Sequence, residues 1–121
     1  QASPPIGTQD HMKNLSLEKV EIRGPFDATK RDDGWHLTIK MNEALEHAKG
    51  RKVNFVIIKT GLPDSKEIRF MGNLQEASEL FAEETWTDIN LMVVSHIGFI
   101  YGGDGRAEND MFPIIRYARP K

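Results

Sequence analysis

Residues 89–101 read INLMVVSHIGFIY, the most apolar run in the chain, and a helix-start sequence, NLQE at residues 73–76, precedes it. The run is too apolar for either of its faces to lie against water, so other elements must cover both faces. We expect either one long strand bent at Gly98 or two strands with a tight change of direction between Ser95 and Gly98. The rest of the chain is predicted to form the elements that cover this run.

The segment just before the apolar run predicts an amphipathic helix over residues 73–85. Asn73 and Glu76 have the spacing of a capping box, in which each side chain accepts a hydrogen bond from the other residue's backbone N–H. The apolar residues that recur on one face of this helix are Leu74, Ala77, Leu80 and Phe81.

Residues 53–59 and 66–71 predict two antiparallel strands joined by a turn at residues 61–65. The first strand has apolar residues on both faces, which is typical of a central strand, and we expect Phe55 in the core. The second strand alternates between apolar and charged residues, which indicates one buried face.

Alternation is cleanest in residues 35–39, which predict a strand that follows a turn at Asp33-Gly34. A helix is predicted over residues 42–49, with Asn42 as its N-cap and Gly50 just after its end.

Two further strands are predicted near the two ends of the chain. Residues 17–23 alternate weakly, which indicates a half-buried strand. Residues 111–117 predict the last strand, which Pro113 places toward a sheet edge because proline has no N–H to donate.

The order of these elements predicts an α+β fold, with an antiparallel sheet and two helices on one of its faces. Residues 35–96 follow the βαββαβ order of a ferredoxin-like core, and the strands at 17–23 and 111–117 are added at the edges. The alternative is a rearranged α+β sheet with the same elements. Residues 12–121 have the length of one domain, and residues 1–11 are predicted to be an artificial or disordered leader.

Composition excludes several classes of function. The formal net charge of −2 provides no strong positive field for nucleic acid, which is disfavoured as a partner. The absence of cysteine excludes disulfides, thiolate metal sites and a cysteine nucleophile. No apolar run reaches the ~18–20 residues of a membrane-spanning helix, so no membrane partner is expected. The compartment stays open, with the cytoplasm favoured.

Two motifs near residue 105 contain ligand-binding groups but favour a plain loop. Residues 102–105 read Gly-Gly-Asp-Gly, whose N–H groups can cradle a phosphate, but the Gly-Lys-Ser/Thr of a P-loop is absent. Asp104, Glu108 and Asp110 supply three carboxylates without the spacing of an EF-hand. We therefore expect a solvated loop here.

The histidines outside the leader do not form a zinc motif. His36, His47 and His96 include no His-x-x-x-His or His-x-His pair, so a zinc site would need ligands from distant segments. Because the zinc spacing and the P-loop residues are both missing, we expect neither a metal nor a cofactor.

Aromatic residues on the peripheral strands are the candidates for a binding surface. If both helices cover one face of the sheet, some aromatic side chains lie on the open face and can bind a partner. The alternative is that they pack in the core or at an oligomer interface. The binding residues predicted in this way are Trp35, Phe99, Tyr101, Arg106 and Tyr117.

The leading hypothesis is a small, soluble, non-catalytic binding or regulatory domain, which engages a protein partner or self-associates through its open sheet face. One alternative is an acid-base enzyme with a polar cluster of His96, Tyr101 and Asp104 around the end of a strand. In that hypothesis His96 is the general acid or base, whereas the simpler interpretation is a half-buried, hydrogen-bonded histidine. A third hypothesis is a small-ligand pocket between sheet and helices.

Overall fold

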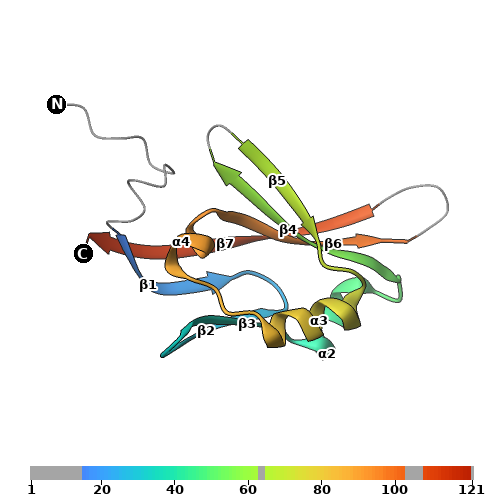
Figure 1. Cartoon of the computed structure of the whole chain (residues 1–121). Coiled ribbons are helices and arrows are strands. Elements are labelled where there is room, and N and C mark those ends of the chain that lie inside the picture. The colour runs from blue at the N-terminus through green and yellow to red at the C-terminus, as the bar shows by residue number, and fades with distance from the viewer. Residues whose placement is uncertain (1–14, 63–64, 103–107, 121) are drawn as a thin grey trace.

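The computed structural model describes residues 15–62, 65–102 and 108–120 (Figure 1). Their elements, in chain order, are β1 (Leu15–Ile22), β2 (Phe26–Arg31), β3 (Gly34–Ile39), α2 (Met41–Ala48), β4 (Val53–Leu62), β5 (Ser65–Phe70), α3 (Leu74–Glu83), α4 (Asp88–Met92), β6 (Val94–Tyr101) and β7 (Glu108–Pro120). This confirms a mixed α and β fold in which antiparallel strands dominate.

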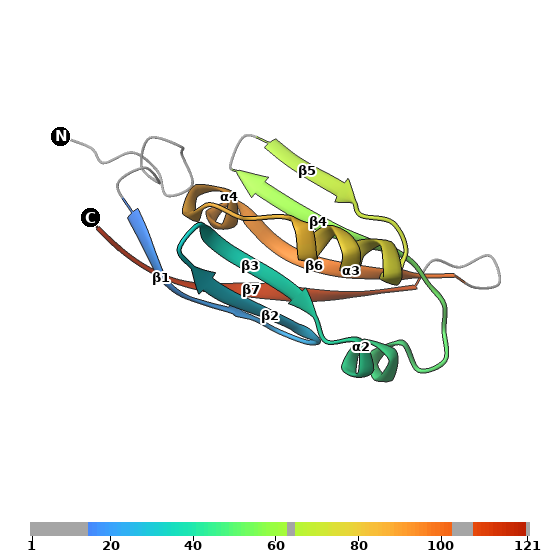
Figure 2. The same cartoon turned by 60° about the horizontal axis from the view of Figure 1, so that its bottom comes forward.

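The strands form a five-stranded sheet in the order β1-β7-β6-β4-β5 and a separate two-stranded hairpin, β2-β3. Each strand pair is antiparallel. The hairpin and α3 lie on the same side of the large sheet (Figures 1 and 2). We call this covered side the inner face and the opposite side the outer face.

Aromatic rings fill the space between the hairpin and the inner face. The buried ring of Phe26, on β2, lies 6.4 Å from Phe81 of α3, 5.5 Å from Phe99 of β6 and 5.4 Å from Phe112 of β7, measured between ring centroids. One side chain thus joins the hairpin, a helix and two strands of the sheet, and such edge contacts add to the free energy gained by burial.

Strand β2 was not among the predicted elements, because residues 26–31 carry too many charges. Its alternation places Phe26 toward the core and Asp27 toward water, and β3 pairs with it along its whole length. The predicted strand 35–39 therefore exists as β3, but it belongs to the hairpin and is not part of the large sheet. The ferredoxin-like arrangement is not confirmed for this reason.

The apolar run at residues 89–101 is only partly a strand. Asp88–Met92 form the short helix α4, whose first turn Thr87 caps by accepting a hydrogen bond from the Asn90 N–H at 3.0 Å. The prediction of one or two strands over the whole run was wrong, because a short apolar stretch does not distinguish a buried helical turn from a strand. The strand β6 begins at Val94 and continues through Gly98.

The capping box that begins α3 is confirmed. The Asn73 Oδ1 accepts from the Glu76 N–H at 2.9 Å, and the Glu76 Oε1 accepts from the Asn73 N–H at 3.0 Å. The predicted N-cap of helix α2 was wrong: the N-cap is Lys40, two residues before Asn42, and Asn42 lies inside the first turn.

Phe55 is not in the core, contrary to prediction. Val53 pairs with Tyr101 and Phe55 pairs with Ile100, so Asn54 is an extra residue in β4. Such a bulge reverses the alternation after it. Val53 and Val56 consequently both reach the inner face, and Phe55 is turned to the outer face.

Pro113 lies where β7 exchanges one neighbour for another. Residues Glu108–Pro113 pair with β6, and residues Ile114–Pro120 pair with β1. The strand thus lies inside the sheet order. The prediction that it lies toward a sheet edge was wrong. The two ladders meet at this residue, whose carbonyl accepts from the Arg23 N–H at 3.1 Å, and the end of a ladder tolerates the missing N–H of proline.

Candidate functional site

The outer face carries a group of apolar side chains that we call the outer patch. Ile57 is paired with Phe70 on one side and with Gly98 on the other, and Gly98 is paired with Met111. Directly opposed residues point to the same face of a sheet, so four neighbouring strands contribute to one surface. The outer patch consists of Phe55, Ile57, Ile68, Phe70, Ile100 and Met111.

Much of this apolar surface is open to solvent. The exposed fractions are 43% for Phe55, 51% for Ile68, 58% for Phe70 and 40% for Met111. Among the described elements, neither a helix nor the hairpin packs on this face. Single exposed apolar residues are ordinary, but a contiguous group of them marks an interaction site.

The side chains of the outer patch pack on one another. The rings of Phe55 and Phe70 meet edge to face, with centroids 5.4 Å apart and planes at 78°. Ile57 lies between its larger neighbours and is only 1% exposed, although no other layer covers it in the described part of the chain. The outer patch is therefore a pre-formed apolar surface.

A polar cluster surrounds Tyr101, the last residue of β6, whose side chain points to the inner face. The Arg51 guanidinium lies over the Tyr101 ring, 3.8 Å from its centroid, and forms ion pairs with Glu108 at 2.7 Å and Asp110 at 3.7 Å. The Tyr101 hydroxyl donates to the Asp110 carboxylate. Burial, and then this hydrogen bond to a carboxylate, raise the pKa of Tyr101 well above its ordinary value.

The contacts of this cluster serve to hold neighbouring elements together. A tyrosine whose pKa is raised stays protonated at neutral pH, and its proton is already held by Asp110. Arg51 is held in turn by the carbonyls of Ala48 and His47, at 2.7 and 3.0 Å. The cluster joins the segment that follows α2 to β6 and β7.

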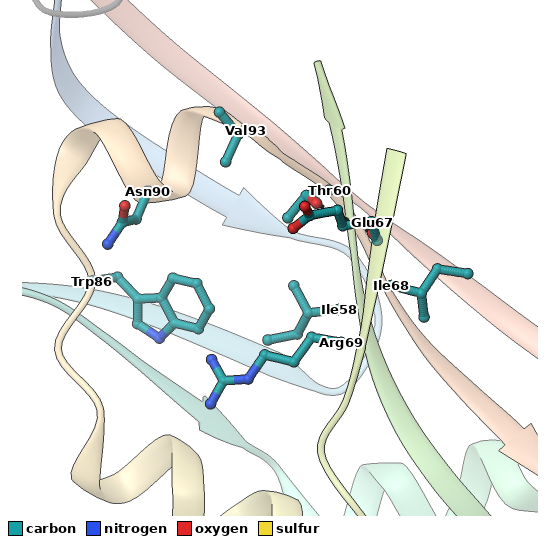
Figure 3. A pocket seen from close by; sticks show the side chains of 8 residues that line it. All are labelled: Ile58, Thr60, Glu67, Ile68, Arg69, Trp86, Asn90 and Val93. Atoms are coloured by element: carbon teal, nitrogen blue, oxygen red, sulfur yellow. Dashed lines mark hydrogen bonds between the residues drawn. The ribbon is translucent and has the colours of Figure 1, made fainter. Parts of the chain in front are cut away.

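A pocket of about 290 Å³ opens between β4, β5 and the segment that contains Trp86. Figure 3 shows the Trp86 ring, with Ile58 and the Arg69 side chain beside it. Arg69 forms an ion pair with Glu84 at 2.6 Å, and the buried Trp86 indole N–H has no partner among the described residues. The residues that line the pocket are Ile58, Thr60, Glu67, Ile68, Arg69, Trp86, Asn90 and Val93.

Most of the binding residues predicted from the sequence are not on the outer face. Trp35, Phe99 and Tyr101 are buried on the inner side. Trp35 is held there by its indole N–H, which donates to Asp88 at 2.8 Å. Tyr117 is exposed, with the Lys19 ammonium 5.5 Å from its ring centroid. Arg106 lies outside the described residues.

The structure does not bring the predicted acid-base residues together. His96 and Tyr101 are an odd number of positions apart on the unbroken strand β6, so their side chains leave opposite faces. His96 forms a hydrogen bond with the Ser95 hydroxyl at 3.0 Å, and that hydroxyl donates to the Lys59 carbonyl at 3.1 Å. Asp104 lies outside the described residues.

Only some members of the outer patch could be predicted from the sequence. The alternation of β5 does place Ile68 and Phe70 together on one face, but alternation alone does not tell which face other elements cover. Phe55 was missed because the bulge at Asn54 has no signal in the sequence. Met111 had no apparent role until its pairing with Gly98 was known.

Comparison with known proteins adds no further assignment: no family model, no curated protein and no solved structure matches this chain. Within the described ranges, no group of three or more histidine, aspartate or glutamate side chains is placed to hold a metal ion. Nor is any described helix long and apolar enough to span a membrane.

Proposed function

We propose that this domain is a non-catalytic binding or regulatory module that engages a protein partner, or a second copy of itself, through the outer patch. The observation that carries the proposal is the contiguous exposure of Phe55, Ile68, Phe70 and Met111 on a sheet face without a covering layer in the described part of the chain. Burial of apolar surface is the main driving force of protein association.

The magnitudes support this proposal. Burying a large apolar side chain completely stabilises a complex by ~1.5–3 kcal/mol, so four half-exposed side chains provide several kcal/mol in total. Aromatic residues and methionine are also enriched in protein interfaces. The edge-to-face pair of Phe55 and Phe70 loses little conformational freedom on binding, because the two rings already restrain each other.

The other hypotheses have less support. The acid-base hypothesis required His96 and Tyr101 in one cluster, and they leave opposite faces of β6. The small-ligand hypothesis rests on the pocket beside Trp86, where the unpaired indole N–H is the one feature that favours a polar ligand. That N–H is buried, so a ligand would have to displace neighbouring side chains to reach it.

The experiment compares a patch variant with a matched control. The patch variant, Phe55→Thr with Phe70→Thr, replaces both rings by a residue that favours strands. The control, Leu45→Gln, removes an equally exposed apolar side chain from α2, away from the outer patch. The readouts are the fluorescence of an apolar dye, anilinonaphthalene sulfonate, and the dependence of NMR line widths on protein concentration.

We expect the wild-type protein to bind the dye and to show broadened amide signals at the outer patch as its concentration rises. The patch variant should lose most of both effects, and Leu45→Gln should retain them. A wild-type protein with neither effect, or a patch variant that behaves like the wild type, would overturn the proposed function.

A further inference from the structure

The strand β5 leaves one edge of the large sheet open. It is the outermost strand in the sheet order and pairs only with β4 among the described residues. An edge strand presents unpaired backbone N–H and C=O groups, which form a template for another strand. The open edge also borders the outer patch, since Ile68 and Phe70 belong to both.

The direction of each backbone group on β5 follows from the hydrogen bonds to β4. The Met71 N–H donates to the Val56 carbonyl at 2.8 Å, and the Glu67 carbonyl accepts from the Thr60 hydroxyl at 3.2 Å. Backbone groups alternate in direction along a strand. The groups of Glu67 and Arg69 therefore face β4, and those of Ile68 and Phe70 face away from the sheet.

We propose that two copies of this chain join edge to edge through β5, antiparallel, with a two-fold axis at Ile68. This inference rests on the interaction role proposed above, and it names a second copy of the chain as the partner at the edge that borders the outer patch. The axis sets Ile68 opposite Ile68 of the second copy, where the outward backbone groups of both residues form a hydrogen-bonded pair. A two-fold interface of this kind uses the same strand from each copy.

The charges of Glu67 and Arg69 match this register. With the axis at Ile68, Glu67 lies opposite Arg69 of the second copy, and Arg69 lies opposite Glu67 of the second copy. These are non-hydrogen-bonded pairs, in which Cα atoms are about 4.5 Å apart and the side chains are closest. Both residues are exposed, and opposite charges placed directly across a strand pair are attractive.

Other two-fold registers lose this match. The residues with outward backbone groups are those at positions 66, 68 and 70, and an axis at position 67, 68 or 69 pairs these groups with one another. An axis at 67 or 69 would oppose Glu67 to Glu67 or Arg69 to Arg69, so only the axis at 68 opposes Glu67 to Arg69. An axis at Phe70 would oppose Arg69 to Met71 of the second copy and leave Glu67 without a partner. Arg69 can keep its ion pair with Glu84 in the dimer, because a guanidinium has five N–H donors.

The apolar residues support the same arrangement. Ile68 and Phe70 point to the outer face in each copy, so the two outer patches lie beside each other on one side of the joined sheet. The charged pairs then lie on the inner side, next to the pocket that Glu67 and Arg69 line. The dimer therefore has one apolar face and one charged seam.

The main experiment reverses one charge at a time and follows association by sedimentation velocity. Glu67→Arg places two arginines opposite each other twice in the homodimer, and Arg69→Glu does the same with two glutamates. We expect each variant alone to dimerise more weakly than the wild type, on the order of tenfold or more. A mixture of the two should recover a heterodimer, because each Arg–Arg or Glu–Glu pair becomes an Arg–Glu pair.

A matched control and a second probe keep the test independent of folding. Glu46→Arg makes the same charge reversal on an exposed position of α2 and should dimerise like the wild type. The chain has no native cysteine, so Ile68→Cys introduces a single thiol. Opposed Cα atoms about 5.5 Å apart are within disulfide range, and Ile68→Cys should oxidise to a covalent dimer, whereas Phe70→Cys should not.

The outcomes separate this inference from the proposed function. Recovery of a heterodimer in the mixture, together with selective oxidation of Ile68→Cys, supports the edge dimer even if one charge variant folds poorly on its own. If the wild type stays monomeric, or the mixture gains nothing and both cysteine variants oxidise alike, the edge dimer is overturned. Dye binding that is lost in the Phe55→Thr, Phe70→Thr variant would still support the outer patch in that event.

Discussion

Met111 lies directly across Gly98 on the outer face, so that a Cβ built at Gly98 would stand 2.5 Å from the Met111 sulfur and 3.2 Å from the Ile57 Cγ1. The absence of a side chain at position 98 lets the methionine lie flat on β6. Met111 and Ile57 thus border the same space above Gly98, in the middle of the outer patch.

The first prediction follows from this contact. Gly98→Ala should push the Met111 side chain off the sheet, while the flexible thioether limits the loss of unfolding free energy to about 1 kcal/mol. The exposed area of Ile57 should increase, and with it the binding of an apolar dye. Urea denaturation and dye fluorescence measure the two effects. Gly61→Ala is the control, since a Cβ there meets nothing within 4 Å.

A second prediction contrasts two phenylalanines. Phe99 is fully buried in the core, and Phe55 is on the outer face. Phe99→Ala should cost ~3–5 kcal/mol of unfolding free energy through lost burial and a residual cavity. Phe55→Ala should cost about 1 kcal/mol, as expected for a half-exposed side chain. Equal losses in chemical denaturation would contradict the assignment of Phe55 to the outer face.

A third prediction tests the start of α3. Asn73→Ala removes the acceptor for the Glu76 N–H and should cost about 1 kcal/mol of unfolding free energy. Asn73→Ser keeps a capping oxygen and should be nearly neutral. The midpoints of chemical denaturation distinguish the two variants. If serine were as costly as alanine, the cap would contribute nothing through its side-chain oxygen.

The fourth prediction concerns alkaline pH. Because the pKa of Tyr101 is higher in the folded state than its ordinary value of 10.0, the folded protein retains this proton where the unfolded chain releases it. The resulting stabilisation is complete below about pH 10 and is lost as the pH rises above that value. Tyr101→Phe should flatten this decline, and it should cost about 1 kcal/mol near neutrality by removing the bond to Asp110.

Stability measured by denaturant titration from pH 8 upward provides the test of the fourth prediction. Tyr117→Phe is the matched control, because it removes an exposed tyrosine hydroxyl from the neighbouring strand. If the wild type and Tyr101→Phe decline with the same slope, the bond between Tyr101 and Asp110 does not hold the proton.

Features encoded within a few residues could be predicted from the sequence. The capping box of Asn73 and Glu76 is local, and its hydrogen bonds depend on spacing alone. The alternation of residues 35–39 likewise gave a strand with Trp35 and Leu37 on its buried face. The mixed α and β class followed from the order of such elements.

Features decided by distant segments could not be predicted. The bulge at Asn54 arises from pairing with β6 and reverses the orientation of Phe55. Helix α4 forms where Asp88 can accept from the Leu17 N–H at 3.3 Å and from the Trp35 indole. These partners are far from residue 88 in the sequence. The outer patch depends on which face the hairpin covers, which is also a property of the assembled sheet.

The pairing of β1 with β7 also constrains how the protein is made. Leu15 is opposed to Pro120. The strand β1 is therefore synthesised before almost all of the described chain, and its partner β7 is synthesised last among the described elements. Contacts of such long sequence separation slow folding and leave an early strand exposed to other chains. The large sheet is therefore completed only after translation of β7, and until then β1 is an edge without a neighbour.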